Sequence, residues 1–94
     1  MRTSAPEVYA AGDVAEHFDL SREKHRVNAI WPEAVSQGRV AGLNMAGQTT
    51  SYRGSLSRNV MRIFDTDVMS AGRVSQRDLD DSCRTAEAFD SKHK

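Results

Sequence analysis

Two short stretches of the sequence carry residues that could bind a ligand. Gly12 and Asp13 follow the short apolar run Val8-Tyr9-Ala10-Ala11. A carboxylate at the end of a parallel strand lies at the edge where α/β sheets bind ligands, and Gly12 leaves room for a close approach because it has no side chain. Asp is also a common cap of a following turn. The residues alone leave both interpretations of Asp13 open.

The second stretch is Trp31-Pro32-Glu33-Ala34, which has the composition of a helix start. Proline is favoured in the first turn because its missing N–H is not needed there, and Glu complements the positive end of the helix dipole. Free N–H groups at such an end favour an anion. Trp31 could lie against a ligand or serve as a core anchor. Glu33 is interpreted as a first-turn charge without catalytic duty.

Other residues with reactive side chains form no recognisable site. His17, His25 and His93 are far apart in polar surroundings, and we expect them at the surface. Cys83 is the single cysteine, so it cannot form an internal disulfide. We therefore assign no catalytic residue and no metal ligand.

Composition limits the classes of partner. The 94 residues suffice for one small domain, and the 13 basic and 13 acidic residues cancel. Basic and acidic residues also nearly cancel within each half of the chain, so we expect no broad basic surface that could bind nucleic acid or anionic lipid. No apolar run could span a membrane, and the start lacks the apolar core of a secretory signal. We therefore expect a cytoplasmic chain.

The elements expected to position these residues are few. The run over residues 7–11 predicts a strand buried on both faces, and residues 15–28 predict an irregular surface loop or a frayed helical turn. A helix is predicted from Pro32 to about Ala46, with Gly47 as its stop. Its predicted packing stripe consists of small or apolar residues: Ala34, Gly38, Ala41 and Met45.

The second half of the chain predicts a hairpin and a tail. Residues 57–64 alternate with a period of two and predict a strand, and residues 68–71 predict a second strand after a connection at 65–67. The polar composition of residues 77–94 predicts a loosely ordered tail. The fold class is therefore α/β, with one buried strand, a helix and a short antiparallel β-hairpin.

Several linked motifs resemble one known family. The stretch from Val8 to Glu16 resembles the second flavin motif of the FAD-dependent pyridine nucleotide-disulfide oxidoreductases. Further motifs follow in the family's order and spacing: Trp31-Pro32-Glu33-Ala34, Gln37-Gly38-Arg39-Val40-Ala41, Asn44-Met45-Ala46-Gly47 and Tyr52-Arg53-Gly54. The resemblance covers residues 3 to 74 and is closest to the NADH oxidase, coenzyme A-disulfide reductase, rubredoxin reductase and nitrite reductase branch.

The resemblance implies FAD as cofactor. Asp13 would accept a hydrogen bond from a ribityl hydroxyl, and the helix start would face the pyrimidine edge of the flavin ring, where the amides of Glu33 and Ala34 stabilise negative charge. The cofactor-binding residues implied in this way are Gly12, Asp13, Trp31, Pro32, Glu33 and Ala34.

Other family features are missing from the sequence. It has no Gly-x-Gly-x-x-Gly loop for FAD or for NAD(P)H, and no redox cysteine near its start. It resembles the end of an FAD-binding, Rossmann-like domain over residues 1–47 and the start of a dimerisation-type C-terminal domain over 48–76, followed by the tail.

The expected function follows from that placement. The chain would be the FAD-binding segment of an NAD(P)H-dependent oxidoreductase that passes a hydride to a disulfide, dioxygen or protein acceptor, and it would be inactive alone. The alternative is a non-enzymatic interaction module that pairs its strand over residues 57–64 with itself or with a full-length relative.

Overall fold

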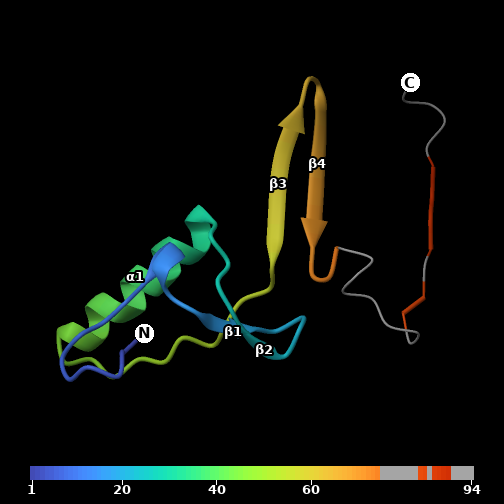
Figure 1. Ribbon diagram of the computed structural model, residues 1–94. Coiled ribbons are helices and arrows are strands. Elements are labelled where there is room, and N and C mark those ends of the chain that lie inside the picture. Colours follow the sequence, from blue (N-terminus) through green and yellow to red (C-terminus); the bar gives the residue numbers. More distant parts are fainter. Residues whose placement is uncertain (75–82, 85, 90–94) are drawn as a thin grey trace.

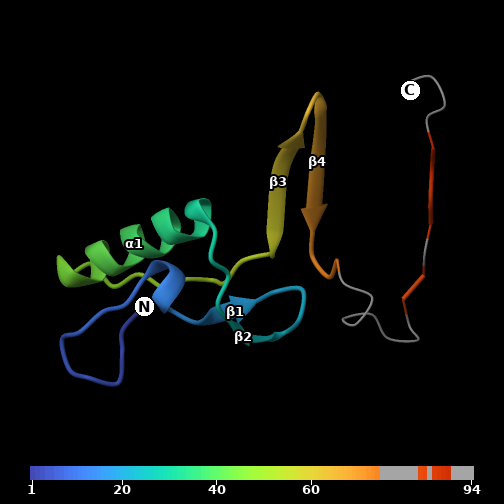
Figure 2. The same cartoon turned by 45° about the horizontal axis from the view of Figure 1, so that its top comes forward.

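The computed structural model describes residues 1–74, 83–84 and 86–89. These residues form a small α/β arrangement with one helix and two antiparallel hairpins (Figure 1). A short 3-10 turn, η1 (Gly12–Val14), packs against the helix α1 (Trp31–Met45). The hairpin of β3 (Arg58–Ile63) and β4 (Thr66–Ala71) stands away from both, as Figures 1 and 2 show.

The helix forms where the sequence predicts it. Ile30 is the N-cap in extended conformation, and Pro32 lies in the first turn. At the other end Gly47, with φ of 82°, donates its N–H to the Asn44 carbonyl. The Gln48 N–H donates to the Leu43 carbonyl, which completes a Schellman motif. Both predicted ends are confirmed within one residue.

The predicted packing stripe of the helix is wrong at two of its four residues, Gly38 and Met45, which are exposed. The buried helical residues are Glu33, Gln37 and Ala41, which repeat every four residues on one face. Of the predicted stripe only Ala41 is buried, while Met45 is 65% exposed. A Cβ atom built at Gly38 would meet nothing within 4 Å. Ala34 lies against the turn η1, whereas Gly38 and Met45 face solvent.

The strand predicted over residues 7–11 is also wrong. Val8 is 50% exposed, and Tyr9 forms only an isolated antiparallel bridge with Arg2. Bonds from the Thr3 and Ala10 N–H groups fold the first ten residues back on themselves. A strand buried on both faces needs a sheet with layers packed over both of its faces, and the described residues build no sheet around residues 7–11 beyond this bridge.

Residues 15–28, predicted to be irregular, contain a short hairpin. β1 (His17–Asp19) pairs with β2 (Lys24–Arg26) in antiparallel register. The Asp19 carboxylate closes the turn by accepting hydrogen bonds from the backbone and hydroxyl of Ser21 and from the backbone and guanidinium of Arg22. Burial alone would raise the pKa of Asp19, but these hydrogen bonds outweigh it and hold the pKa below its usual range.

A second contact ties β1 to the segment that follows the helix. The chain after α1 runs back along the helix towards β1 in both views (Figures 1 and 2). There the Ser55 N–H donates to the Phe18 carbonyl, and the Leu20 N–H donates to the Ser55 carbonyl. Gly54, with φ of 88°, makes this approach possible, because a Cβ atom there would lie 2.4 Å from the Phe18 carbonyl oxygen.

The predicted C-terminal hairpin is confirmed, with a tighter turn. Ile63 pairs with Thr66, so Phe64 and Asp65 alone form the connection. Every residue of β3 is exposed, and no other element packs against either strand in the described residues. The expectation of a loosely ordered tail over 77–94 falls mostly outside the described residues. Among the described residues, no helix combines the length and the apolar character that crossing a bilayer requires.

Candidate functional site

The Gly12–Asp13 turn lies against the start of the helix. Gly12 adopts φ of 81°, which favours glycine, and a Cβ atom there would lie 3.5 Å from the Cβ of Ala34. The Ala15 N–H donates to the Gly12 carbonyl and closes η1. The turn and the first turns of α1 are therefore neighbours, as the resemblance requires.

Asp13 points its carboxylate at solvent. The N-cap position of η1 is Ala11, so Asp13 lies inside the turn and does not occupy the capping position. Among the described residues its carboxylate has no hydrogen-bond or ion-pair partner, and the residue is exposed. The carboxylate is free to accept a hydrogen bond from a ligand.

The start of α1 has fewer free donors than the sequence suggests. The N–H groups of Glu33 and Ala34 both donate to the Ile30 carbonyl at 3.1 Å, and Pro32 has no N–H. The Trp31 N–H is the first-turn donor without an acceptor among the described residues. The Trp31 side chain is 79% exposed, so it is not a core anchor in the described structure.

An open cavity of about 320 Å³ lies beside this helix start. Its walls come from the helix start and from the base of β3. The lining residues are Ile30, Trp31, Pro32, Arg58, Asn59 and Val60. Asp13 does not line this cavity.

Glu33 turns away from the surface and into the interior. It is 5% exposed, accepts a hydrogen bond from the Tyr52 hydroxyl, and forms an ion pair with Arg58 at 3.6 Å. Burial, and then the hydrogen bond to Glu33, raise the pKa of Tyr52 above its usual value. Glu33 therefore links the helix to the segment after it.

A buried line of hydrogen bonds lies behind the Gly12 turn. The Gly12 N–H donates to Oε1 of Gln37 at 2.9 Å, and Nε2 of Gln37 lies 3.0 Å from Nδ1 of His17. Nε2 of His17 lies 2.8 Å from the Ser55 hydroxyl. Gln37 is 1% exposed and His17 is 3% exposed, so the expectation that His17 is a surface residue is wrong.

The sequence interpretation missed this buried group. Gln37, His17, Tyr52 and Ser55 are polar, and polar residues are normally assigned to the surface. One signal could have found part of it. Glu33, Gln37 and Ala41 share a helix face at four-residue spacing, and a Gln on that face must be satisfied by buried partners.

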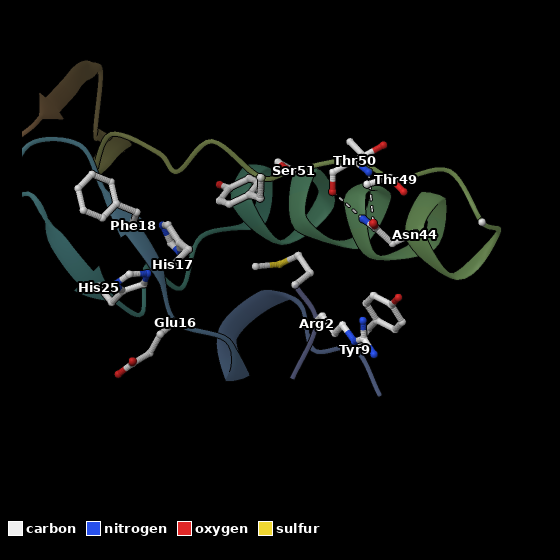
Figure 3. Close-up of a pocket in the computed structure, with 13 residues that line it drawn as sticks. Arg2, Tyr9, Glu16, His17, Phe18, His25, Asn44, Thr49, Thr50 and Ser51 are labelled. Carbon is white, nitrogen blue, oxygen red and sulfur yellow. Dashed lines mark hydrogen bonds between the residues drawn. The ribbon is translucent and has the colours of Figure 1, made fainter. Parts of the chain in front are cut away.

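A larger cavity lies on the other side of His17. Figure 3 shows this space of about 610 Å³, with Arg2 and Tyr9 near one end and Phe18 and His25 at the other. The Asn44 side chain bridges the carbonyls of Val40 and Thr50 and so fixes one wall. None of the residues predicted to bind a cofactor lines this cavity.

Comparison with known proteins gives several relatives, although no family model matches the chain. An NADH oxidase of Methanocaldococcus jannaschii is 35% identical over 72 residues, which cover 77% of this chain. A CoA-dependent NAD(P)H sulfur oxidoreductase of Pyrococcus furiosus is 30% identical over 89 residues, or 95% of the chain. An NADH-rubredoxin oxidoreductase of Clostridium acetobutylicum is 32% identical over 74 residues, or 79%.

These matches also define how much of each relative the chain represents. The chain spans 16% of the Methanocaldococcus protein, 20% of the Pyrococcus protein and 18% of the Clostridium protein. Because the Pyrococcus match covers 95% of the chain, the similarity extends beyond residue 74, where the motifs end. These matches to NAD(P)H oxidoreductases, at 30–35% identity over at least 77% of the chain, identify this sequence: the chain belongs to the pyridine nucleotide-disulfide oxidoreductase family.

Proposed function

We propose that the chain supplies FAD contacts in an NAD(P)H-dependent oxidoreductase of this family. The observation that supports this most directly is the packing of the Gly12–Asp13 turn against the first turns of α1, with the Asp13 carboxylate exposed. FAD, when bound, would take up a hydride from NAD(P)H and pass electrons to a disulfide, dioxygen or protein acceptor.

The residues of this chain fit such a group. The positive φ of Gly12 favours glycine, and the absence of a side chain there lets the turn lie close against Ala34 of the helix start. The Asp13 carboxylate would accept a hydrogen bond from a ribityl hydroxyl. The Trp31 N–H and the exposed indole lie at the positive end of α1 and would face the flavin ring. The first turn of α1, which contains Pro32, Glu33 and Ala34, would orient the helix start towards the ring.

The domain organisation is part of the same proposal. Residues 1–47 would be the end of an FAD-binding, Rossmann-like domain, and residues 48–76 the start of a C-terminal domain of the dimerisation type. The β3–β4 hairpin then belongs to the second unit, which agrees with its few contacts with α1: the ion pair of Arg58 with Glu33 is the one that links the two among the described residues.

Titration of the 94-residue chain with FAD, followed by amide NMR, tests the proposal. One carboxylate and one helix end cannot hold a dinucleotide tightly without a pyrophosphate loop, so we expect binding weaker than micromolar. Shift changes should centre on residues 12–14 and 31–34. Asp13→Asn should abolish the changes at the turn, and Glu16→Gln, an exposed acid outside it, should not. Changes confined to other residues would overturn the proposal.

A second function is favoured by the exposure of the β3–β4 hairpin. Val60 and Met69 are directly paired and 63% and 76% exposed, and Phe64 at the turn is 93% exposed. We propose that two copies of the chain pair through their strands at residues 57–64, whose edge has no described partner. Light scattering at high concentration tests this. A dimer that Val60→Lys converts to a monomer supports pairing, and a monomeric unsubstituted chain contradicts it.

A further inference from the structure

The buried hydrogen bonds behind the Gly12 turn have directions that their chemistry fixes. The Gly12 group is a backbone N–H, so the Gln37 atom 2.9 Å from it must be the acceptor oxygen. The amide nitrogen of Gln37 is then the atom that faces Nδ1 of His17, at 3.0 Å. An amide nitrogen only donates. Nδ1 of His17 must therefore accept, which requires that it carries no proton.

The other ring nitrogen of His17 completes the argument. A neutral imidazole whose Nδ1 accepts has its proton on Nε2. Nε2 lies 2.8 Å from the Ser55 hydroxyl oxygen, which accepts that proton's hydrogen bond. Ser55 is itself held by backbone bonds to β1. Gln37 thus donates to His17, and His17 donates to Ser55, which is anchored to β1.

The charged and titratable groups around His17 have other partners. Glu33 is engaged by the Tyr52 hydroxyl and Arg58, and Asp19 by Ser21 and Arg22. The Tyr52 ring meets the imidazole edge to face, with centroids 5.5 Å apart. Arg26 on β2 pairs with His17, and Lys24 and His25 precede it on the same strand; all three are exposed. No described carboxylate accepts a hydrogen bond from the His17 ring.

We propose that Gln37 and His17 are positioning residues for the Gly12–Asp13 turn, and that they act with His17 neutral and protonated on Nε2. Gln37 holds the Gly12 N–H, His17 holds Gln37 in the orientation that permits this, and Ser55 holds His17. The proposal rests on the flavin-facing function proposed for the turn, because that function is what the positioning serves.

The first test uses the unsubstituted 94-residue chain and needs no flavin. Long-range proton–nitrogen NMR correlation distinguishes the two neutral forms of His17 and the charged form by their nitrogen shifts. We expect a protonated Nε2 and an unprotonated Nδ1 at neutral pH. A proton on Nδ1, in either the neutral or the charged ring, would overturn the proposal.

Two substitutions of Gln37 distinguish the effect of its hydrogen bonds from the effect of its side-chain volume. Gln37→Glu keeps an acceptor for Gly12 but places a second acceptor opposite Nδ1, so the His17 proton must move to Nδ1 or the ring must become charged. Gln37→Leu removes both partners, and exchange of the Gly12 amide proton should accelerate about tenfold or more. Gln48→Glu and Gln48→Leu, at an exposed position, are the matched controls.

The outcomes are distinct. An unchanged His17 proton position in Gln37→Glu, or unchanged Gly12 exchange in Gln37→Leu, contradicts the proposal. If Gln37→Leu fails to fold, the proton position in the unsubstituted chain and in Gln37→Glu still decides. FAD-induced shifts at Asp13 should survive in Gln37→Glu and disappear in Gln37→Leu. Their absence from the unsubstituted chain as well would contradict the proposed flavin function, whatever the state of His17.

Discussion

The two halves of the described structure are stabilised in different ways. The part from Gly12 to Ser55 buries mostly polar side chains: His17, Asp19, Glu33, Gln37 and Ser55. Its buried apolar residues are only Ala15 and Ala41. The β3–β4 hairpin buries no residue and is held by its backbone ladder and by exposed side-chain pairs. We call these two regions the polar body and the free hairpin.

The difference predicts opposite responses to substitution. A buried donor or acceptor that loses its partner costs about 1–3 kcal/mol, while an exposed one is satisfied by water. Single substitutions in the polar body should therefore lower the free energy of unfolding strongly, each through the buried partner that it leaves unpaired. Substitutions in the free hairpin should change the stability little, because an isolated two-stranded hairpin is only marginally stable.

Gly54→Ala should have the largest effect and should disrupt the polar body. A Cβ atom there would lie 2.4 Å from the Phe18 carbonyl oxygen, on a residue with φ of 88°. Strain at positive φ adds about 1–2 kcal/mol, so we expect a total loss of more than about 3 kcal/mol. Urea unfolding followed by circular dichroism measures this. NMR should show shift changes around Ser55 and His17.

Gly42→Ala is the matched control for that substitution. Gly42 lies in α1, and a Cβ atom there would meet nothing within 4 Å. Alanine is the better helix former by about 1 kcal/mol, so this variant should be more stable. Equal losses at positions 42 and 54 would contradict the packing of Gly54 against β1.

Asp19→Asn should have the next largest effect, and its effect should depend on pH. The substitution weakens charge-assisted hydrogen bonds from Ser21 and Arg22, at a cost of about 1.5–3 kcal/mol in all. Because the pKa of Asp19 is lowered in the folded chain, its contribution is complete above the ordinary value near 3.8 and is lost as the pH falls below it.

Unfolding free energies of both proteins, measured at intervals from pH 6 to pH 2, test this sign. The gap between the unsubstituted chain and Asp19→Asn should be constant above about pH 5 and should narrow towards pH 2. Asp65→Asn, in the turn of the free hairpin, is the control. A gap that does not change with pH would mean that the Asp19 carboxylate has no special stabilisation.

The contrast between the two regions also explains what the sequence could predict. The helix and the C-terminal hairpin were predictable because their signals are local. Pro32 and Gly47 mark the helix ends, and the alternation over residues 57–64 marks a strand. The packing of Gly12 against Ala34 agrees with the family resemblance, although composition alone does not reveal it.

The polar body was not predictable in the same way. A strand over residues 7–11 was inferred from its apolar run, but a strand forms only where neighbours accept its hydrogen bonds. The hairpin over residues 17–26 has no apolar alternation, because it is set by the Asp19 turn and by the contact with Ser55. His17 and Gln37 are buried through partners 38 and 25 residues away, a distance that local patterns do not encode.

Tyr52→Phe should have a moderate effect. The variant keeps the ring contact with His17 and removes the hydroxyl that donates to buried Glu33, at a cost of about 1–2 kcal/mol. The pKa of Tyr52 is raised in the folded chain, so the hydroxyl stabilises fully below its ordinary value near 10.0 and less as the pH rises past it.

The measurement is unfolding at pH 8 and at intervals up to about pH 11.5. The unsubstituted chain should lose stability relative to Tyr52→Phe across that range. Tyr9→Phe is the control, since the Tyr9 hydroxyl has no hydrogen-bond partner among the described residues. A difference that widens with pH would contradict the assignment of the Tyr52 hydroxyl as a donor to Glu33.

The smallest effect should come from Arg62→Ala in the free hairpin. This variant allows a direct comparison of the two regions, because each has an Arg–Asp pair among the described residues. Arg62 bonds Asp67 through two contacts of 2.8 and 3.0 Å, yet the two side chains are 68% and 60% exposed. The pair of Arg22 with Asp19 has a longer contact of 3.1 Å, but its side chains are 10% and 6% exposed. Exposed pairs contribute about 0.2–1 kcal/mol to stability and weaken with salt, whereas removing the partner of a buried carboxylate costs much more.

A double-mutant cycle of each pair, at low salt and at high salt, should therefore give the longer, buried pair a larger coupling energy than the shorter, exposed one. The reverse order would mean that hydrogen-bond geometry outweighs burial in this chain.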